Sequence, residues 1–154
     1  MNNTNAVGRS MIEMLGVLAV VGILSAGAMV GYSKAMAKYK ADKTIKQMSQ
    51  IITNISTVYA QQGRDYKGLD NIAAIRLGVV PTEMIVNAAT GEIKNLYQGS
   101  VTIKGKIDGE TFSVIFDKLP KEVSITLGTL DWGVDDRSGL QGVKLMKTGR
   151  GESE

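Results

Sequence analysis

Hydrophobic positions follow different patterns in successive parts of the chain. Residues 14–31 carry no charged side chain, and a helix of this length spans about 27 Å, close to the thickness of a bilayer core. Residues 32–62 contain neither glycine nor proline, and their apolar positions recur at helical steps of three and four. These positions are Ala41, Ile45, Met48, Ile52, Ile55 and Tyr59. We therefore expect one helix from near residue 9 to near residue 62, apolar in its first half and amphipathic in its second.

The apolar period changes to two from residue 98 onward, which is typical of β-strands. We expect strands at four sets of alternating positions: Val101 with Ile103; Phe112, Val114 and Phe116; Val123, Ile125 and Leu127; and Val143 with Leu145. Asp108-Gly109, between the first two sets, is a strong hairpin turn signal. Residues 63–95 are expected to form a loop with one short helix, which starts at Asp70 or Asn71 and which Gly78 stops after Leu77.

These elements together predict an α+β fold. An antiparallel sheet over residues 96–147 would have one apolar face that needs a cover, and the amphipathic helix half, residues 32–62, can supply it. The expected architecture is a long N-terminal helix packed on a small antiparallel β-sheet head. Residues 148–154 are polar and are expected to form a flexible tail.

Composition argues against several classes of function. The net charge is only +3 and aromatic residues make up 5%, so the basic face and the stacking platforms typical of nucleic-acid binding are not indicated. The chain has no cysteine and no histidine, which excludes thiolate nucleophiles, disulfides, imidazole bases and the usual zinc ligand sets. We therefore expect neither an enzyme nor a cofactor. Asp131, Asp135 and Asp136 are a weak calcium candidate that turn formation explains as well.

The apolar segment allows two interpretations. It can be a transmembrane helix, or it can be the core of a secretory signal with Arg9 as its basic flank and cleavage after Ala28. Glu13 lies at its edge, where a buried charge costs on the order of 3 kcal/mol, so the carboxylate needs a partner. That partner can be Arg9, four residues earlier on the same helix, or a cation on another subunit. Gly27 and Gly31 have the G-x-x-x-G spacing of close helix contacts, although glycine is also simply tolerated in membrane helices.

The N-terminal residues resemble a known processing signal. Gly8-Arg9-Ser10-Met11-Ile12-Glu13, followed by the apolar segment, is similar to the prepilin signature of type IV pilins and type II secretion pseudopilins. The resemblance implies that residues 1–8 are a leader, that a prepilin peptidase cuts after Gly8 and methylates the new terminus at Arg9, and that Glu13 is the fifth mature residue. Arg9 stands where the family usually has a hydrophobic residue, and the leader lacks the family's usual basic residue.

The second part of the chain resembles the head domain of type IVb pilins. The resemblance rests on three stretches: YKGLDNIAAIRLGVVPTEMI, LYQGSVTI and FSVIFDKLPKEVSITL. Ser124 stands where such heads usually have a cysteine that forms a disulfide.

Together these similarities imply a structural subunit of a type IV pilus, most similar to type IVb. Residues 9–31 would be the transmembrane helix of a precursor that contacts lipid in the bacterial inner membrane, and then the assembly helix of a homo-oligomeric, extracellular helical filament. Inner-membrane pilus machinery would build the filament. Glu13 would pair with a neighbour's amino terminus, and Gly27 and Gly31 would lie at helix contacts. Alternatives are a pseudopilin in a periplasmic pseudopilus of type II secretion, a secreted domain cleaved after Ala28, and a monomeric membrane-anchored protein.

The charge around the apolar segment conflicts with this topology. Only Arg9 precedes the segment, and five lysines follow it: Lys34, Lys38, Lys40, Lys43 and Lys46. The positive-inside rule would place the lysine-rich side in the cytoplasm, whereas a pilin needs that side outside it.

Overall fold

The computed structural model describes residues 4–130, with side chains from residue 10 onward. The chain divides into two compact units, Met1–Lys40 and Ala41–Glu154. Three expectations lie outside the described residues: the strand at Val143 and Leu145, the calcium candidates at Asp131, Asp135 and Asp136, and the tail at 148–154.

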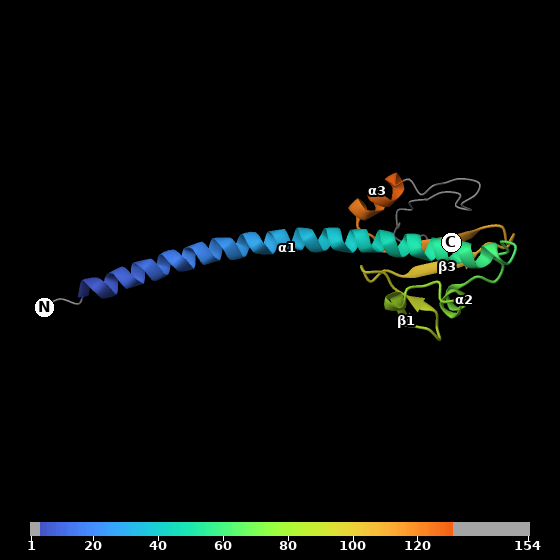
Figure 1. Cartoon of the computed structure of the whole chain (residues 1–154), viewed down its shortest axis with the longest axis horizontal. Helices are drawn as coiled ribbons and strands as arrows, with labels where there is room; N and C mark the ends of the chain where they lie inside the picture. Colours follow the sequence, from blue (N-terminus) through green and yellow to red (C-terminus); the bar gives the residue numbers. More distant parts are fainter. Residues whose placement is uncertain (1–3, 131–154) are drawn as a thin grey trace, which may run out of the picture. The chain divides into compact units, whose positions relative to one another are not determined.

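One helix, α1 (Thr4–Ala60), contributes to both units, which confirms the expected long N-terminal helix (Figure 1). It contains no proline, and alanine, lysine, glutamine and methionine are frequent in it. After Ala60 the chain turns through Gly63 and Arg64, whose φ angles of 77° and 59° lie in the left-handed region. The Arg64 N–H donates to the Tyr59 carbonyl at 2.9 Å, which satisfies one of the last carbonyls of α1.

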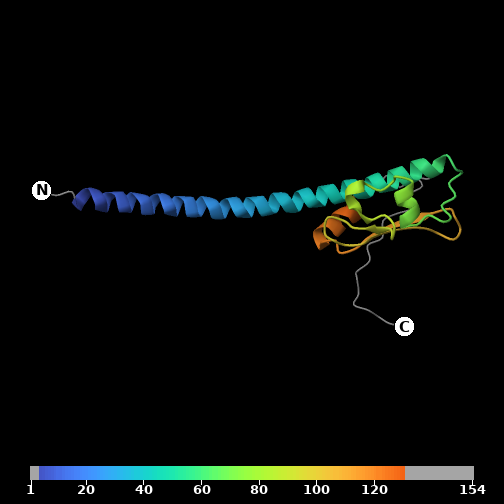
Figure 2. The ribbon, with the colours of Figure 1, turned by 90° about the horizontal axis from the view of Figure 1, so that it is seen from below.

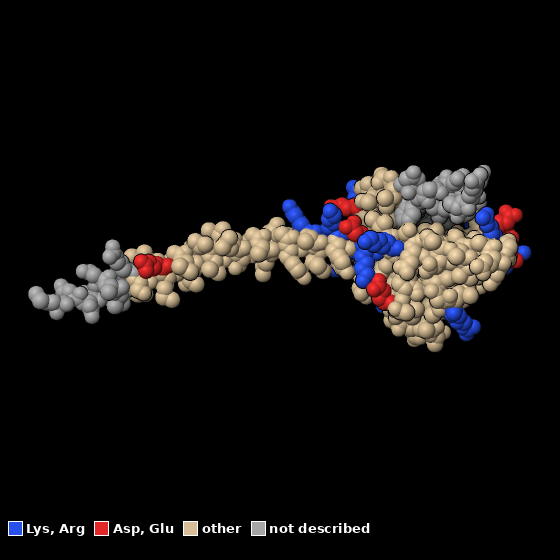
Figure 3. Space-filling model, viewed as in Figure 1, with Lys and Arg blue, Asp and Glu red and all other residues tan. Residues whose placement is uncertain are grey.

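In the first unit, α1 exposes its apolar side chains. Every residue from 10 to 31 is exposed, and mean hydropathy reaches 2.2 in the most apolar part of this helix. By length and composition α1 is able to cross a membrane, a test that a signal sequence near an N-terminus also passes. In Figure 3 the N-terminal part of α1 carries one acidic group and then a long stretch without any charged side chain on the visible face.

In the second unit, α1 forms one wall of the hydrophobic core. Ile51 and Ile55 are fully buried and belong to the same core cluster as Val101 and Ile103 of the sheet, so the amphipathic half covers the sheet as expected (Figures 1 and 2). Of the predicted stripe, three residues are buried and three are half-buried: Met48, Ile55 and Tyr59, then Ala41, Ile45 and Ile52. The buried face also includes Thr44, Gln47 and Ile51, which are not among the six positions of the predicted stripe.

The expected hairpin is confirmed. Strands β3 (Val101–Gly105) and β4 (Phe112–Phe116) pair antiparallel, with Val101 opposite Phe116 and Ile103 opposite Val114. The connecting turn contains Asp108 and Gly109, as the sequence predicts, and Gly109 has a φ of 77°. Ile107 in this turn is 97% exposed.

Residues 63–95 contain more regular structure than the sequence analysis expected. The predicted short helix is α2 (Asn71–Arg76), whose first turn is capped by the Asp70 carboxylate accepting from the Ala73 N–H at 2.7 Å. A single 3-10 turn, η1 (Thr82–Met84), leads into β1 (Ile85–Asn87), which pairs antiparallel with β2 (Glu92–Ile93). These strands of three and two residues are too short for an alternating pattern to indicate them.

The expected strand at Val123, Ile125 and Leu127 is wrong, because these residues lie in helix α3 (Lys121–Thr129). Val123 and Leu127 are four residues apart, so a helix places both on one face, where they pack with Met48. Ile125 lies on the opposite side and is 50% exposed. Pro120 at the N-cap position starts the helix, since the missing N–H of proline costs nothing there.

Two asparagines, the buried Asn95 and the half-buried Asn71, fix the loops around the sheet. The Asn95 side chain donates to the Asp117 carbonyl at 2.7 Å and accepts from the N–H groups of Tyr97 and Gly99, at 2.8 and 3.0 Å. Asn71 donates to carbonyls of Gly91 and Val101 and accepts from the Ile103 N–H. Residue 99 must be glycine because a Cβ there would lie 1.9 Å from the Asp117 carbonyl oxygen.

Candidate functional site

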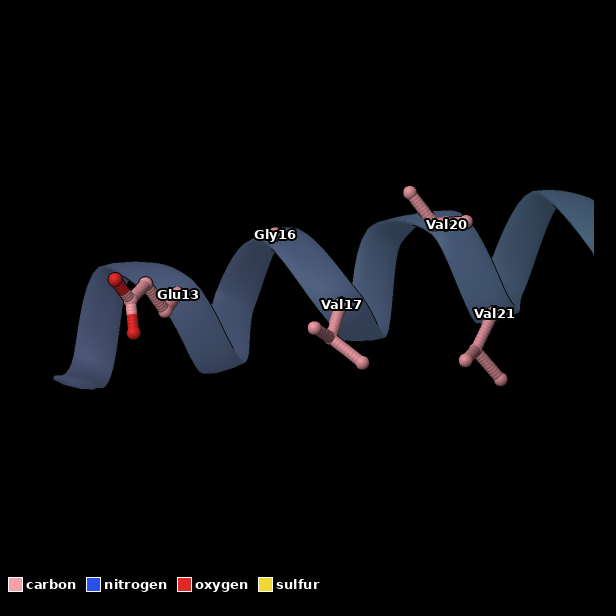
Figure 4. A pocket seen from close by; sticks show the side chains of 5 residues that line it. All are labelled: Glu13, Gly16, Val17, Val20 and Val21. Atoms are coloured by element: carbon pink, nitrogen blue, oxygen red, sulfur yellow. The ribbon is translucent and has the colours of Figure 1, made fainter.

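Glu13 lies on a groove-bearing face of α1 in the first unit. Glu13, Gly16, Val17, Val20 and Val21 line an open surface groove. Their spacing of three and four residues places them on one face of the helix, and the missing side chain of Gly16 creates the hollow between the carboxylate and the valines (Figure 4). The groove can therefore receive an apolar side chain of another helix close to a carboxylate.

The Glu13 carboxylate has no hydrogen bond or ion pair with any residue between 10 and 130. It is exposed, as are the apolar side chains that follow it. The expected alternative of an intrahelical contact with Arg9 lies outside the described side chains. An exposed carboxylate beside an exposed apolar helix is able to accept a cation from another molecule.

The glycines of the apolar segment leave open space on the helix surface. A Cβ atom added at Gly16, Gly22, Gly27 or Gly31 would meet nothing within 4 Å. Gly27 and Gly31 are four residues apart and share a face, so the backbone is accessible there over one turn. In this unit these glycines therefore have no packing role, and their use for close helix contact is compatible with the structure.

A second polar group, in the head, was missed by the sequence analysis. Glu83 of η1 accepts hydrogen bonds from Gln47 at 2.6 Å and from Lys43 at 3.0 Å, both on α1 (Thr4–Ala60). These two bonds, first that of Gln47 and then that of Lys43, lower the pKa of the Glu83 carboxyl. The partners are separated by 36 and 40 residues, so no local motif announces them. The group joins η1 to the helix that covers the sheet.

Metal chemistry has no site in the part of the chain that the structure describes. No three His, Cys, Asp or Glu side chains among these residues are close enough to hold an ion. Asp131, Asp135 and Asp136 are not among them.

Comparison with known proteins identifies the family. The family model described as bundlin matches residues 33–152, most of the chain. The chain belongs to the bundlin family. Two curated relatives are each named major structural subunit of bundle-forming pilus, from Escherichia coli O127:H6 (strain E2348/69 / EPEC) and Escherichia coli O111:H-. Each is 25% identical over 135 residues, which are 86% of this chain and 69% of the relative. No solved structure matches.

Membership of the bundlin family confirms the resemblance to type IVb pilins. The bundlin match begins at residue 33, within α1, and covers the amphipathic half and the head. The processing signature at Gly8 and Arg9, Glu13, and the glycines at 27 and 31 therefore lie before the matched region. Their roles rest on the chemistry of the first unit and on the similarity of the N-terminal residues to prepilins.

Proposed function

We propose that this chain is a structural subunit of a type IV pilus that polymerises through residues 9–31 of α1. The observation that carries the proposal is an apolar helix segment exposed from residue 10 to residue 31, with a carboxylate at its edge that has no partner among residues 10–130, in a chain of the bundlin family. Exposed apolar side chains between residues 11 and 30 are between 51% and 75% accessible. Such a segment must be buried in lipid or against other helices, and a pilus subunit uses both in turn.

The precursor is held in the inner membrane by this segment and is processed there. A prepilin peptidase removes residues 1–8 by cutting after Gly8 and methylates the amino group of Arg9. The inner-membrane assembly machinery then transfers the subunit from lipid into a homo-oligomeric filament outside the cell. Support for this order comes from the prepilin-like residues 8–13 and from the capacity of α1 to cross a membrane.

Glu13 sets the axial register of the filament by pairing with the amino terminus of an adjacent subunit. A carboxylate in an apolar environment is costly unless it is paired, so misplaced subunits leave an uncompensated charge. The pair therefore acts by penalising wrong stagger more than by adding affinity. The groove at Gly16 beside Glu13 leaves room for the neighbouring chain to approach.

Replacement of Glu13 tests the role in assembly. Glu13→Gln is expected to lower filament yield by about tenfold or more. Removing one partner of a buried charge pair costs about 1.4 kcal/mol or more for each subunit that joins the filament, and 1.4 kcal/mol corresponds to about a tenfold change in the equilibrium. The measurement is the amount of sheared filament per cell, with total subunit compared by immunoblot. Glu110→Gln, an equal charge change at an exposed position of the head, is the control and should leave the yield unchanged. Normal filaments from Glu13→Gln would contradict the proposed pairing.

Mass analysis of the mature chain tests the processing step. The expected mature terminus is N-methylated Arg9. A terminus at Met29 would instead establish the secreted domain cleaved after Ala28, without any assembly helix. A chain that keeps residues 1–8 and forms no filament would establish the monomeric membrane-anchored alternative.

A further inference from the structure

The segment directly after the apolar span of α1 carries aromatic and basic side chains together. Tyr32 and Tyr39 are 68% and 56% exposed, and Lys34 and Lys38 are exposed as well. No acidic residue lies between positions 32 and 39. We call these four residues, Tyr32, Lys34, Lys38 and Tyr39, the interfacial belt. All of them belong to the first unit, whose described side chains have no apolar core to bury them.

Tyr32, Lys34 and Lys38 of the belt lie within reach of one headgroup layer when residues 14–31 span the hydrocarbon, whereas Tyr39, about 12 Å beyond the end of the span, approaches that layer only because its side chain tilts back toward the helix N-terminus. Tyr32 follows the span immediately, and Lys34 and Lys38 lie about 4.5 Å and about 10 Å beyond its end along the helix axis. The headgroup layer is roughly 5–7 Å deep on each side of the hydrocarbon core. The flexible stem of Lys38 is long enough to bring its ammonium group back to that layer.

The tyrosines and the lysines of the belt lie on different sides of the helix. Tyr32 and Tyr39 are seven residues apart and share a face, whereas Lys34 and Lys38 are four apart and lie on roughly the opposite face. Tyrosine rings prefer the membrane interface, because the ring is apolar and the hydroxyl is polar. Ammonium groups at the same height are attracted by lipid phosphates and by the negative surface potential of a membrane that contains anionic lipids.

We propose that the interfacial belt binds anionic phospholipid headgroups on the non-cytoplasmic side of the membrane and fixes the depth of the precursor before assembly. This inference rests on the proposed function, since it requires a membrane-inserted precursor. Charge complementarity and the direct continuation of the apolar span select lipid as the occupant. It also accounts for lysines on the side where the positive-inside rule disfavours them, because lipid phosphates there compensate their charge.

The test is a measurement of lipid selectivity with the full chain. The protein is reconstituted in phosphatidylcholine vesicles, and the association of spin-labelled phosphatidylglycerol is compared with that of spin-labelled phosphatidylcholine by electron paramagnetic resonance. We expect a preference of roughly five-fold for phosphatidylglycerol, which weakens as sodium chloride is added. Lys34→Gln/Lys38→Gln should reduce the preference to near parity. Lys104→Gln/Lys106→Gln, the same charge change at exposed positions of the hairpin, should leave it unchanged.

Depth is a second readout, which the absence of native cysteine makes simple. An environment-sensitive fluorophore on Ala35→Cys reports the polarity at the belt. In Tyr32→Leu/Tyr39→Leu its emission should shift to the blue, because the helix is no longer held at the interface and slides deeper. An unchanged emission would overturn the anchoring role.

The other outcomes separate the inference from the proposed function. A chain that alkaline carbonate extracts from the vesicles overturns the membrane-inserted precursor and the belt together. A chain that stays inserted but shows no phosphatidylglycerol preference, or keeps it in Lys34→Gln/Lys38→Gln, overturns the belt alone. If this variant keeps the lipid preference but forms no filaments, the lysines serve subunit contacts and the lipid assignment is wrong. If soluble glycerophosphate competed with the labelled lipid, the belt would bind free phosphate, and the proposal that its ligand is a lipid headgroup would be wrong.

Discussion

Asn95 shows how single polar residues hold the loops of a head that has no cysteine. Its side chain is 3% exposed and forms three hydrogen bonds to backbone groups of residues 97, 99 and 117. A disulfide would restrain the unfolded chain, whereas this amide satisfies buried backbone groups of the folded one. Sequence reasoning missed the role of Asn95 and Asn71 in holding the loops, because asparagine there is equally typical of an exposed turn or a helix start.

Asn95→Ala is expected to destabilise the protein by about 3 kcal/mol, because the buried Gly99 N–H and the half-buried Tyr97 N–H and Asp117 carbonyl lose their partner. Urea unfolding of the full chain in detergent, monitored by near-ultraviolet circular dichroism, measures this loss of stability. Asn87→Ala is the matched control. Asn87 is exposed and accepts only from the N–H groups of its own turn, so the expected change is about 0.5 kcal/mol or less. Equal losses in both variants would contradict the role of Asn95.

Glu83 makes the stability of the head depend on acidity. Its pKa in the folded protein is lowered by the bonds from Gln47 and Lys43, so the unfolded chain binds a proton at higher pH than the folded one. The contribution of Glu83 to stability is therefore present above the ordinary pKa of 4.5 and is lost as the pH falls through the lowered value.

The midpoint of thermal unfolding should accordingly differ between the native chain and Glu83→Gln at pH 6, and this difference should shrink as the pH is lowered below 4.5. Glu122→Gln, matched in charge and exposed on α3, controls for the change in net charge. If this difference in unfolding midpoint grew as the pH was lowered, the pKa of Glu83 would be raised rather than lowered by folding, and the proposed role of its two hydrogen bonds would be wrong.

At the scale of elements, α3 shows why a short apolar pattern can be assigned to the wrong structure. Residues 123 and 127 fit a strand face and a helix face equally well, since they are both two alternations and one helical turn apart. Only Ile125 distinguishes the two, and the sequence does not show whether it is buried. The hairpin of β3 and β4 was predictable because a turn signal and longer alternating runs agree. β1 and β2 gave no such signal.

Substitution along α3 distinguishes helix from strand in solution. Leu127→Ala should destabilise the protein by about 3 kcal/mol, because Leu127 is fully buried against Met48 and Val123. Ile125→Lys should change stability by about 0.5 kcal/mol or less, because the side chain is half exposed. Chemical unfolding of the two variants is the measurement. If Ile125→Lys lowered the free energy of unfolding as much as Leu127→Ala, the result would contradict the helix and support a strand at these residues.

At the scale of the whole molecule, assembly is expected to depend on the surface of α1 in the first unit. Gly27→Leu/Gly31→Leu should lower filament yield, since the added side chains occupy the open space through which another backbone approaches. Unfolding of the head should be unchanged. Gly22→Leu adds one leucine side chain on the opposite face and should have a smaller effect on yield than either Gly27→Leu or Gly31→Leu alone. Equal effects at both faces, measured on sheared filaments, would remove the special role of the 27–31 pair.

A candidate assembly residue could be proposed from the sequence, whereas the head's internal contacts could not. Glu13 was selected as a candidate because a lone carboxylate beside an apolar run is physically conspicuous. The group formed by Lys43, Gln47 and Glu83 was not, because its members meet only when η1 folds back onto the second half of α1. Local chemistry is thus visible in the residue pattern, and contacts between distant segments are not.

The turn between β3 and β4 offers a practical use of the molecule. Ile107 is almost completely exposed to solvent. On the other side of the turn, the Gly109 carbonyl accepts a hydrogen bond from the Tyr66 N–H at 2.8 Å. A foreign peptide spliced in after Ile107 would emerge from a tethered base without entering the core. Repeated in every protomer of a fibre, such a graft would turn the polymer into a dense array of one chosen epitope.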